Sequence, residues 1–196
     1  MEKINFIKTF IPQGDFREKY EHGGMMVRHL SAVLDEKMGA YECYECTVPI
    51  GEYDEGEIQN AFAEFSAKMD ALKLKQAKVD KIAEIASYDT SSSVNGFILN
   101  GMLVWLDKAT RVGLMNSTTI AKASGQETTT LWLGGLKLVV DCDKAIQLLS
   151  ALEMYALECF NVTASHKQAV SELTTIEEVE AYDYKAGYPK MLEMSV

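Results

Sequence analysis

The feature that most constrains the fold of this chain is a hairpin-and-helix pattern that occurs twice, at residues 97–124 and 129–160. In each copy, two short apolar stretches flank a turn dipeptide, Asn100-Gly101 in the first and Gly134-Gly135 in the second. Both central positions of a type I′ turn need positive φ, which Gly and Asn tolerate best. Each copy therefore predicts a β-hairpin.

An Asp-Lys-Ala triplet follows each hairpin, at Asp107-Lys108-Ala109 and at Asp143-Lys144-Ala145. An aspartate at a helix start can accept hydrogen bonds from free N–H groups and oppose the positive end of the helix dipole. We therefore expect each triplet to begin a helix. The second helix should span about 142–160, and its wide apolar stripe, which includes Phe160, is typical of a core element.

Two further helices are predicted towards the end of the chain. One should cover 163–173, and a short one should run from Thr175 to Tyr182. Thr175 and Glu178 have the spacing of a capping box, in which each residue satisfies a backbone N–H of the other. The last six residues are expected to be extended.

The residues before the repeated pattern indicate a small sheet followed by one long helix. Residues 41–48 are rich in aromatic and β-branched residues, which favour strands. Residues 56–86 carry apolar residues that alternate by four and three over about four heptads, which predicts a helix with one continuous seam. The seam consists of Ile58, Phe62, Phe65, Met69, Leu72, Val79, Ala83 and Ala86.

The polar, serine-rich stretch 87–95 has no periodicity and is predicted to be a linker. The chain is therefore expected to be an α+β protein in three parts: an N-terminal β region (1–55), a long helix with its linker (56–93) and a C-terminal α+β domain (94–196). Two alternatives remain for the long helix. It either packs its seam on its own sheet, which we favour, or also self-associates or docks on a partner helix.

The charge of the chain disfavours several classes of partner. Its net charge is −10 at pH 7, and its 19 basic residues are scattered, whereas nucleic-acid binding needs clustered Lys and Arg. The sequence contains no apolar run of the length that a membrane-spanning helix needs. Residues 1–16 carry charges within their apolar part, so no secretory signal is expected.

Cys43 and Cys46 form the one motif that suggests a metal or redox site, and a small intracellular metal-binding or redox protein is an open alternative. Structural zinc usually needs a second Cys or His pair, and strand positions three apart face opposite sides. We therefore favour two half-buried cysteines without a joint function. A nucleophile pair such as Cys46 with His29 also stays open, because such partners meet only in space.

No pattern in the sequence calls for catalysis or a cofactor. It contains no phosphate-binding loop, no G-x-G-x-x-G and no G-x-S-x-G, and its acidic clusters do not match a calcium loop. We predict no enzymatic activity, no cofactor and no metal site. Trp105 and Trp132, which take matching places in the two hairpins, are expected to pack in the core, with an exposed binding surface as the alternative.

Three stretches carry a resemblance to a known family. They read NGFILNGMLVWLDKATRVGLMNS, TTTLWLGG and ALEMYALECFNVTASHKQAVSELTTIEEVEAYDYKAGYP, within about 94–190. They resemble a phage-associated family, domain of unknown function 4376, whose members are encoded in tailed-phage and prophage genomes, often near tail-fibre and tail-assembly genes. The stretches FIPQGDF and VRHLSAVLDE also resemble small proteins from Bacteroidales phages.

The resemblance implies a non-enzymatic phage structural or tail-associated protein that acts through protein–protein contacts. It also allows a tail-fibre assembly factor that is absent from the mature virion. The expected location is therefore the virion or the host cytoplasm, and the expected partners are other phage structural proteins or a second copy of the chain. The candidate interaction residues are Ile58, Phe62, Phe65, Met69, Leu72, Trp105 and Trp132.

Overall fold

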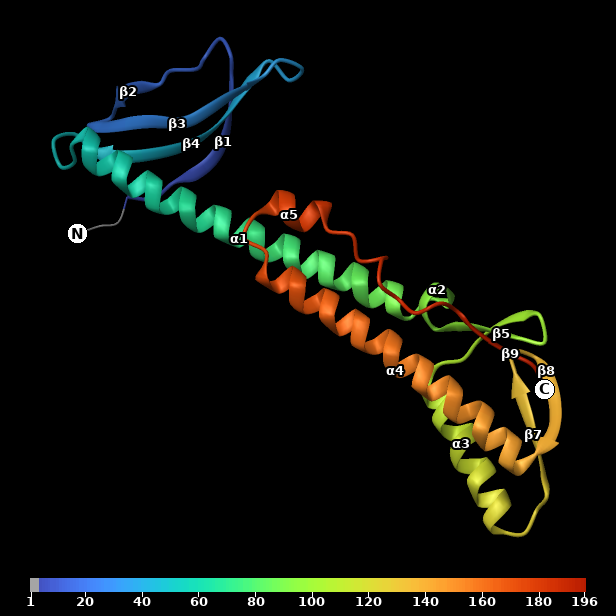
Figure 1. The fold of residues 1–196 in the computed structure, drawn as a ribbon. Helices are drawn as coiled ribbons and strands as arrows, with labels where there is room; N and C mark the ends of the chain where they lie inside the picture. The colour runs from blue at the N-terminus through green and yellow to red at the C-terminus, as the bar shows by residue number, and fades with distance from the viewer. Residues whose placement is uncertain (1–3) are drawn as a thin grey trace. The chain divides into compact units, whose positions relative to one another are not determined.

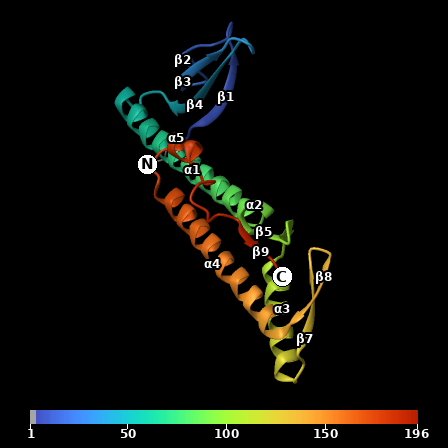
Figure 2. The same cartoon turned by 45° about the vertical axis from the view of Figure 1, so that its right-hand side comes forward.

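The computed structural model describes residues 4–196, and the chain divides into two compact units, Met1–Lys73 and Leu74–Val196. The division falls inside the longest helix, α1 (Glu55–Asp89), which contributes residues to both units. Each unit is described by itself. The elements are labelled in Figures 1 and 2.

The first unit is a four-stranded antiparallel sheet with the beginning of α1 along one face (Figure 1). The strand order is β1-β4-β3-β2, and all three neighbouring pairs are antiparallel. This confirms the predicted N-terminal sheet. The strands are β1 (Ile7–Pro12), β2 (Lys19–His22), β3 (Met25–Asp35) and β4 (Ala40–Pro49).

Apolar side chains at the beginning of α1 fill the space above this sheet. Ile58 is fully buried and packs with a cluster that includes Leu30 and Cys46. One and two turns further along, the rings of Phe62 and Phe65 lie 5.3 and 5.2 Å from the ring of Phe6, centroid to centroid. The first three residues of the predicted seam therefore pack on the sheet of their own chain.

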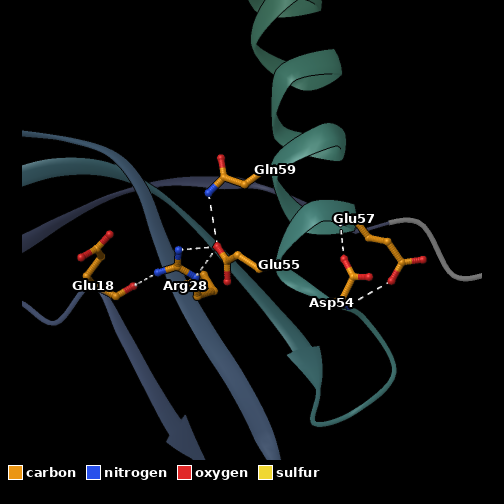
Figure 3. A network of polar contacts seen from close by, with 6 residues as sticks. All are labelled: Glu18, Arg28, Asp54, Glu55, Glu57 and Gln59. Atoms are coloured by element: carbon orange, nitrogen blue, oxygen red, sulfur yellow. Dashed lines mark hydrogen bonds and ion pairs between the residues drawn. The ribbon is translucent and has the colours of Figure 1, made fainter.

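A polar network fixes the N-terminal end of α1 to β3 (Figure 3). The buried guanidinium of Arg28 donates to Glu55 Oε1 at 2.6 Å and to the carbonyl oxygen of Glu18 at 2.7 Å. This hydrogen bond from Arg28 lowers the pKa of Glu55. Beside it, Asp54 and Glu57 each accept a hydrogen bond from the other's backbone N–H, which closes the first turn of the helix.

The second unit contains two hairpins, four further helices and a short terminal strand, which confirms the predicted α+β class. A strand from each hairpin lies along a buried apolar core, into which the first half of the longest helix of this unit also packs. The elements are α2 (Ser92–Asn95), β5 (Gly96–Leu99), β6 (Met102–Trp105), α3 (Lys108–Ala123), β7 (Thr128–Leu133), β8 (Leu136–Asp141), α4 (Cys142–Glu172), α5 (Ile176–Ala181) and β9 (Leu192–Met194).

Both hairpins form around the predicted turn dipeptides. Asn100 and Gly101 have φ values of 49° and 80°, and Gly134 and Gly135 have 58° and 87°. The hairpins differ in their neighbours, because β9 adds to β5 as a parallel strand, whereas β7 and β8 form a two-stranded sheet. The predicted extended tail therefore exists as a strand that completes the first hairpin.

The chain between 142 and 172 forms one helix, so the prediction of two separate helices was wrong. Residues 161–163 are poor helix formers, which favoured a break there. The break is absent because Thr163 is buried and its hydroxyl bonds Asp89 Oδ1 at 2.7 Å and lies 2.9 Å from the hydroxyl of Tyr188. Tertiary contacts therefore hold the helical conformation where local propensity is weak.

The stretch 87–95 is ordered rather than a linker. Its first residues extend α1 to Asp89, and Ser91 caps the short helix α2. The amide of Asn95 donates to the carbonyl of Asp89, and the buried carbonyl of Val94 accepts from Tyr155 Oη at 2.8 Å. Polar composition predicted a linker, but these side chains satisfy the backbone of a tight turn.

The end of the second unit folds back onto α1 and α4, which lie side by side in both views (Figures 1 and 2). Lys78 of α1 donates to the carbonyl of Ser171 near the end of α4, and the buried side chains of Ile85 and Val170 share one cluster. Val179 of α5 completes that cluster. The predicted capping box is present at the start of α5, so this helix begins where the sequence indicates.

Candidate interaction site

The continuous seam predicted along α1 does not exist as one surface. From residue 74 onwards, the apolar residues of α1 that pack in the cluster with α4 and α5 are Leu74, Ala77, Ile82 and Ile85. Leu72 and Val79, which continue the predicted heptads, are each 53% exposed. The seam changes position because the two halves of α1 pack against different elements, and each requires a different face of the helix.

This change divides the candidate contact residues on α1 into two groups. Ile58 is buried and Phe62 and Phe65 are half-buried against the sheet, so these three side chains already stabilise the first unit. Met69 is half-buried and Leu72 is exposed. Phe62→Asp or Phe65→Asp would therefore disturb the packing of α1 on the sheet, so neither variant tests self-association alone.

Trp105 and Trp132 are exposed, at 40% and 59%, so the favoured core position was wrong for both. Each lies next to buried aliphatic residues, Trp105 beside Val104 and Trp132 beside Leu131. Successive strand residues point to opposite faces, so the tryptophans face away from the core. The predicted match between them was also wrong, since Trp105 is in the second strand of its hairpin and Trp132 in the first.

The candidate site is a pocket of about 410 Å³ that lies beside Trp105, between the ends of α1 and β6, the first turn of α3 and the middle of α4. This volume is within the usual range for small-ligand sites. Leu106 and Ala156 are buried, whereas Leu157 and Phe160 are 49% and 61% exposed. The lining residues are Asp89, Thr90, Asn95, Trp105, Leu106, Asp107, Lys108, Arg111, Glu153, Ala156, Leu157 and Phe160.

An ion pair between buried Arg111 and half-buried Glu153 joins α3 to α4 in this pocket. Arg111 is buried, its Nε donates to Glu153 Oε1 at 2.8 Å, and its Nη1 donates to the carbonyl of Leu106 at 2.8 Å. Two donors of the guanidinium are thus used within the chain, and its positive charge is balanced by Glu153. This pair has a structural role, because it fixes the position of α3 on α4.

Most other polar groups of the pocket hold the ends of helices. Asp107 caps α3, since its carboxylate accepts from the backbone N–H and the hydroxyl of Thr110, and these bonds lower the pKa of Asp107. Asp89 accepts from Thr163 at the end of α1. Lys108 is exposed. The pocket therefore combines apolar and aromatic walls with carboxylates at its rim.

The apolar wall continues along the outer face of α4. Met154, Leu157 and Phe160 are spaced by three residues, which places them on one side of the helix, and Met154 is 59% exposed. The sequence predicted Phe160 as part of the core stripe, and this was wrong. The sequence did contain a sign of this exposed face. Together with Met154 and Leu157, the apolar residues of the helix cover more of its circumference than one core face can bury, so some of them must be exposed.

The structure does not bring Cys43 and Cys46 together. Cys46 pairs with Arg28 and packs under α1, whereas Cys43 pairs with Thr9 and faces the other side of the sheet. Both are fully buried rather than half-buried. Burial raises the pKa of each thiol, which favours the protonated form that neither binds metals nor acts as a nucleophile.

The proposed pair of Cys46 with His29 is not formed either, because His29 points to the face opposite that of its neighbour Arg28, which pairs with Cys46. His29 is buried, with its Nδ1 against the carbonyl of Arg17 and its Nε2 3.2 Å from Glu45 Oε2. His166 bonds Tyr182 and the carbonyl of Ala186, which holds the C-terminal tail on α4. Both histidines have structural partners.

Across residues 4–196, no group of three or more His, Cys, Asp or Glu side chains is placed to hold a metal ion. No helix within that range has the length and apolar character needed to cross a membrane.

Part of the chain matches a known protein family. Residues 76–186, more than half of the chain and all within the second unit, match the family described as Domain of unknown function (DUF4376). No curated protein and no solved structure matched the chain. The matched region includes every residue that lines the pocket beside Trp105.

Proposed function

The chain belongs to the family Domain of unknown function (DUF4376), and on this premise we propose that it is a non-enzymatic, tail-associated protein of a tailed phage or prophage. It acts through protein–protein contacts. The phage context comes from the resemblance of its hairpin, helix and terminal sequences to that phage-associated family. The contact role comes from the surface of the second unit.

One observation carries the contact role. Trp105, Leu157 and Phe160 are large, exposed and apolar, and they line the same pocket. A contiguous apolar surface on a folded domain costs solubility unless a partner covers it, and aromatic residues dominate the binding energy of protein interfaces. The titratable groups around it are used as caps and in the Arg111–Glu153 pair, which favours contact over catalysis.

Mass spectrometry of purified particles tests the proposal. Particles of the phage or induced prophage whose genome encodes the chain are expected to contain it in a fixed ratio to tail proteins. Its absence from intact, infective particles would contradict a virion role. If deletion of the gene then still abolished fibre attachment, the chain would be a tail-fibre assembly factor instead.

The contact role is tested separately from the phage context. Phe160→Ser should weaken co-purification of the chain with its tail partner, whereas Ile120→Ser, which removes a similarly exposed apolar residue on α3, should not. Equal effects of the two variants would show that the pocket surface is not the contact.

A further inference from the structure

We infer that the pocket beside Trp105 binds a partner segment in which an apolar side chain is flanked by Lys or Arg. The inference rests on the proposed function, since it names the chemistry of the partner that covers the same surface. It follows from the distribution of charge around the apolar wall.

The apolar wall on α4 is bordered by acidic groups. Between Lys144 and Lys167 the only charged residues of this helix are Glu153 and Glu158. Glu153 lines the pocket, and Glu158 is exposed next to Leu157. A partner helix or strand placed along this part of α4 therefore meets carboxylates and no basic group from α4.

The ends of α1 and α3 add to this negative border. Asp89 lies at the end of α1, whose last turn has no basic residue to offset the negative end of the helix dipole. The positive end of α3 is already capped by Asp107. Glu153 balances the charge of Arg111. Of the other charged residues that line the pocket, Asp89 and Asp107 are acidic and only Lys108 is basic.

The shape of the pocket selects an apolar anchor rather than a charge alone. Its floor is formed by buried Leu106 and Ala156, and the rings of Trp105 and Phe160 line it. An aliphatic or aromatic side chain would be desolvated there, whereas an adjacent Lys or Arg would remain at the rim near the carboxylates. A cation that lies over the Trp105 ring would gain a further contribution.

A second copy of the chain is the less suitable occupant. Each copy has a net charge of −10, and an antiparallel contact between two α4 helices would bring Glu153 and Glu158 of both copies to one interface. Like charges at an interface oppose association. The surface thus complements a basic partner rather than itself.

Fluorescence of Trp105 provides a direct test. The chain has two tryptophans, so Trp132→Phe leaves Trp105 as the only one. Two short amphipathic peptides are titrated into this variant, one of leucine and lysine and the other with glutamate in place of every lysine. We expect the lysine peptide to shift the Trp105 emission and to bind at least about tenfold more tightly, and its affinity should fall as salt is raised.

Matched substitutions locate the binding. Phe160→Ser should lower the affinity for the lysine peptide about tenfold, and Ile120→Ser should leave it unchanged. Glu158→Lys should weaken binding several-fold, whereas Glu180→Lys, the same charge change at an exposed position of α5, should have little effect. Circular dichroism verifies that each variant is folded.

Several outcomes would overturn the inference. One is equal binding of both peptides, and another is equal loss of binding with Glu158→Lys and Glu180→Lys. A third is a stable dimer in light scattering that Phe160→Ser dissociates, because a second copy would then occupy the surface. None of these outcomes bears on the presence of the chain in phage particles, which mass spectrometry of purified particles tests separately.

Discussion

The two hairpin-and-helix units look alike in sequence and differ in structure. Both have the expected turn, but the first hairpin gains a third strand, β9, and the second remains two-stranded. The helices also begin differently. Asp107 caps α3, as its triplet predicts. The predicted start of the second helix at about residue 142 is confirmed, since α4 begins at Cys142, but its cap is Asp141 and not the Asp143 of its triplet.

The physical reason lies in the length of the second strand. The first hairpin leaves Leu106 between β6 and the cap at Asp107, whereas β8 runs directly to Asp141 and α4 follows at once. Asp141 Oδ1 then accepts from the N–H groups of Asp143 and Lys144. Asp143 instead pairs with Lys122 of α3. Similar local sequences thus specify similar elements, and the packing around them determines their ends.

The largest losses of stability are expected from substitutions of core residues in the two hairpins. Phe97→Ala in β5 should lower the free energy of unfolding by about 3–5 kcal/mol, and Leu131→Ala in β7 by about 2–5 kcal/mol. Both side chains are fully buried in the same cluster, and the larger ring leaves the larger cavity. Urea unfolding followed by tryptophan fluorescence measures the effect, since both tryptophans lie in the second unit.

Val33→Ala, at an exposed position of the first unit, is the control and should change the midpoint little. A cost below about 1 kcal/mol for Phe97→Ala would mean that the first hairpin is not a core element.

Alanine should lower the free energy of unfolding by different amounts at the two glycines of the second turn. Gly135→Ala should cost about 1–2 kcal/mol, because φ is +87° and nothing lies within 4 Å of the added carbon. Gly134→Ala should cost about 1 kcal/mol more, since its β-carbon would lie 3.1 Å from Cγ1 of Val104 in the first hairpin. Chemical denaturation compares the two variants. Equal costs would show that the second turn does not pack on the first hairpin.

Tyr155→Phe tests the contact between α4 and the residues of α2 that precede the first hairpin. The variant removes the hydrogen bond from Tyr155 to the carbonyl of Val94, which should cost about 1 kcal/mol at neutral pH.

The same substitution changes the response to alkali. Burial raises the pKa of Tyr155 to about 12, above its ordinary value of 10. The folded state therefore disfavours the phenolate, and stability present below pH 10 is lost as the pH rises towards 12. The difference between wild type and Tyr155→Phe should decrease over that interval. Thermal unfolding across the pH range measures it, and a constant difference would argue against a buried hydroxyl.

The smallest effects are expected at the helix caps. Asp141→Ala should cost about 1 kcal/mol, because two backbone N–H groups lose their acceptor. Asp143→Ala should leave the urea midpoint nearly unchanged, since exposed salt bridges contribute little. If the order of the two variants were reversed, the triplet and not the strand end would define the start of α4.

Local chemistry explains which features could be predicted. The turn glycines, the cap of α3 and the capping box at Thr175 depend on backbone geometry within a few residues, and all of these follow from the sequence. The positions of Trp105 and Phe160 could not be assigned in the same way. An apolar residue in an amphipathic element can face the core or a partner, and only the packing of the other elements decides between them.

The sequence by itself determined the α+β class, the twin turns and the family resemblance, because these depend on residue order and short-range sterics. Only the tertiary structure decided that α1 uses two different apolar faces and that α4 continues past residue 160. It also decided that Trp105, Leu157 and Phe160 share one exposed pocket. These features depend on contacts between residues far apart in the chain, which no local pattern contains.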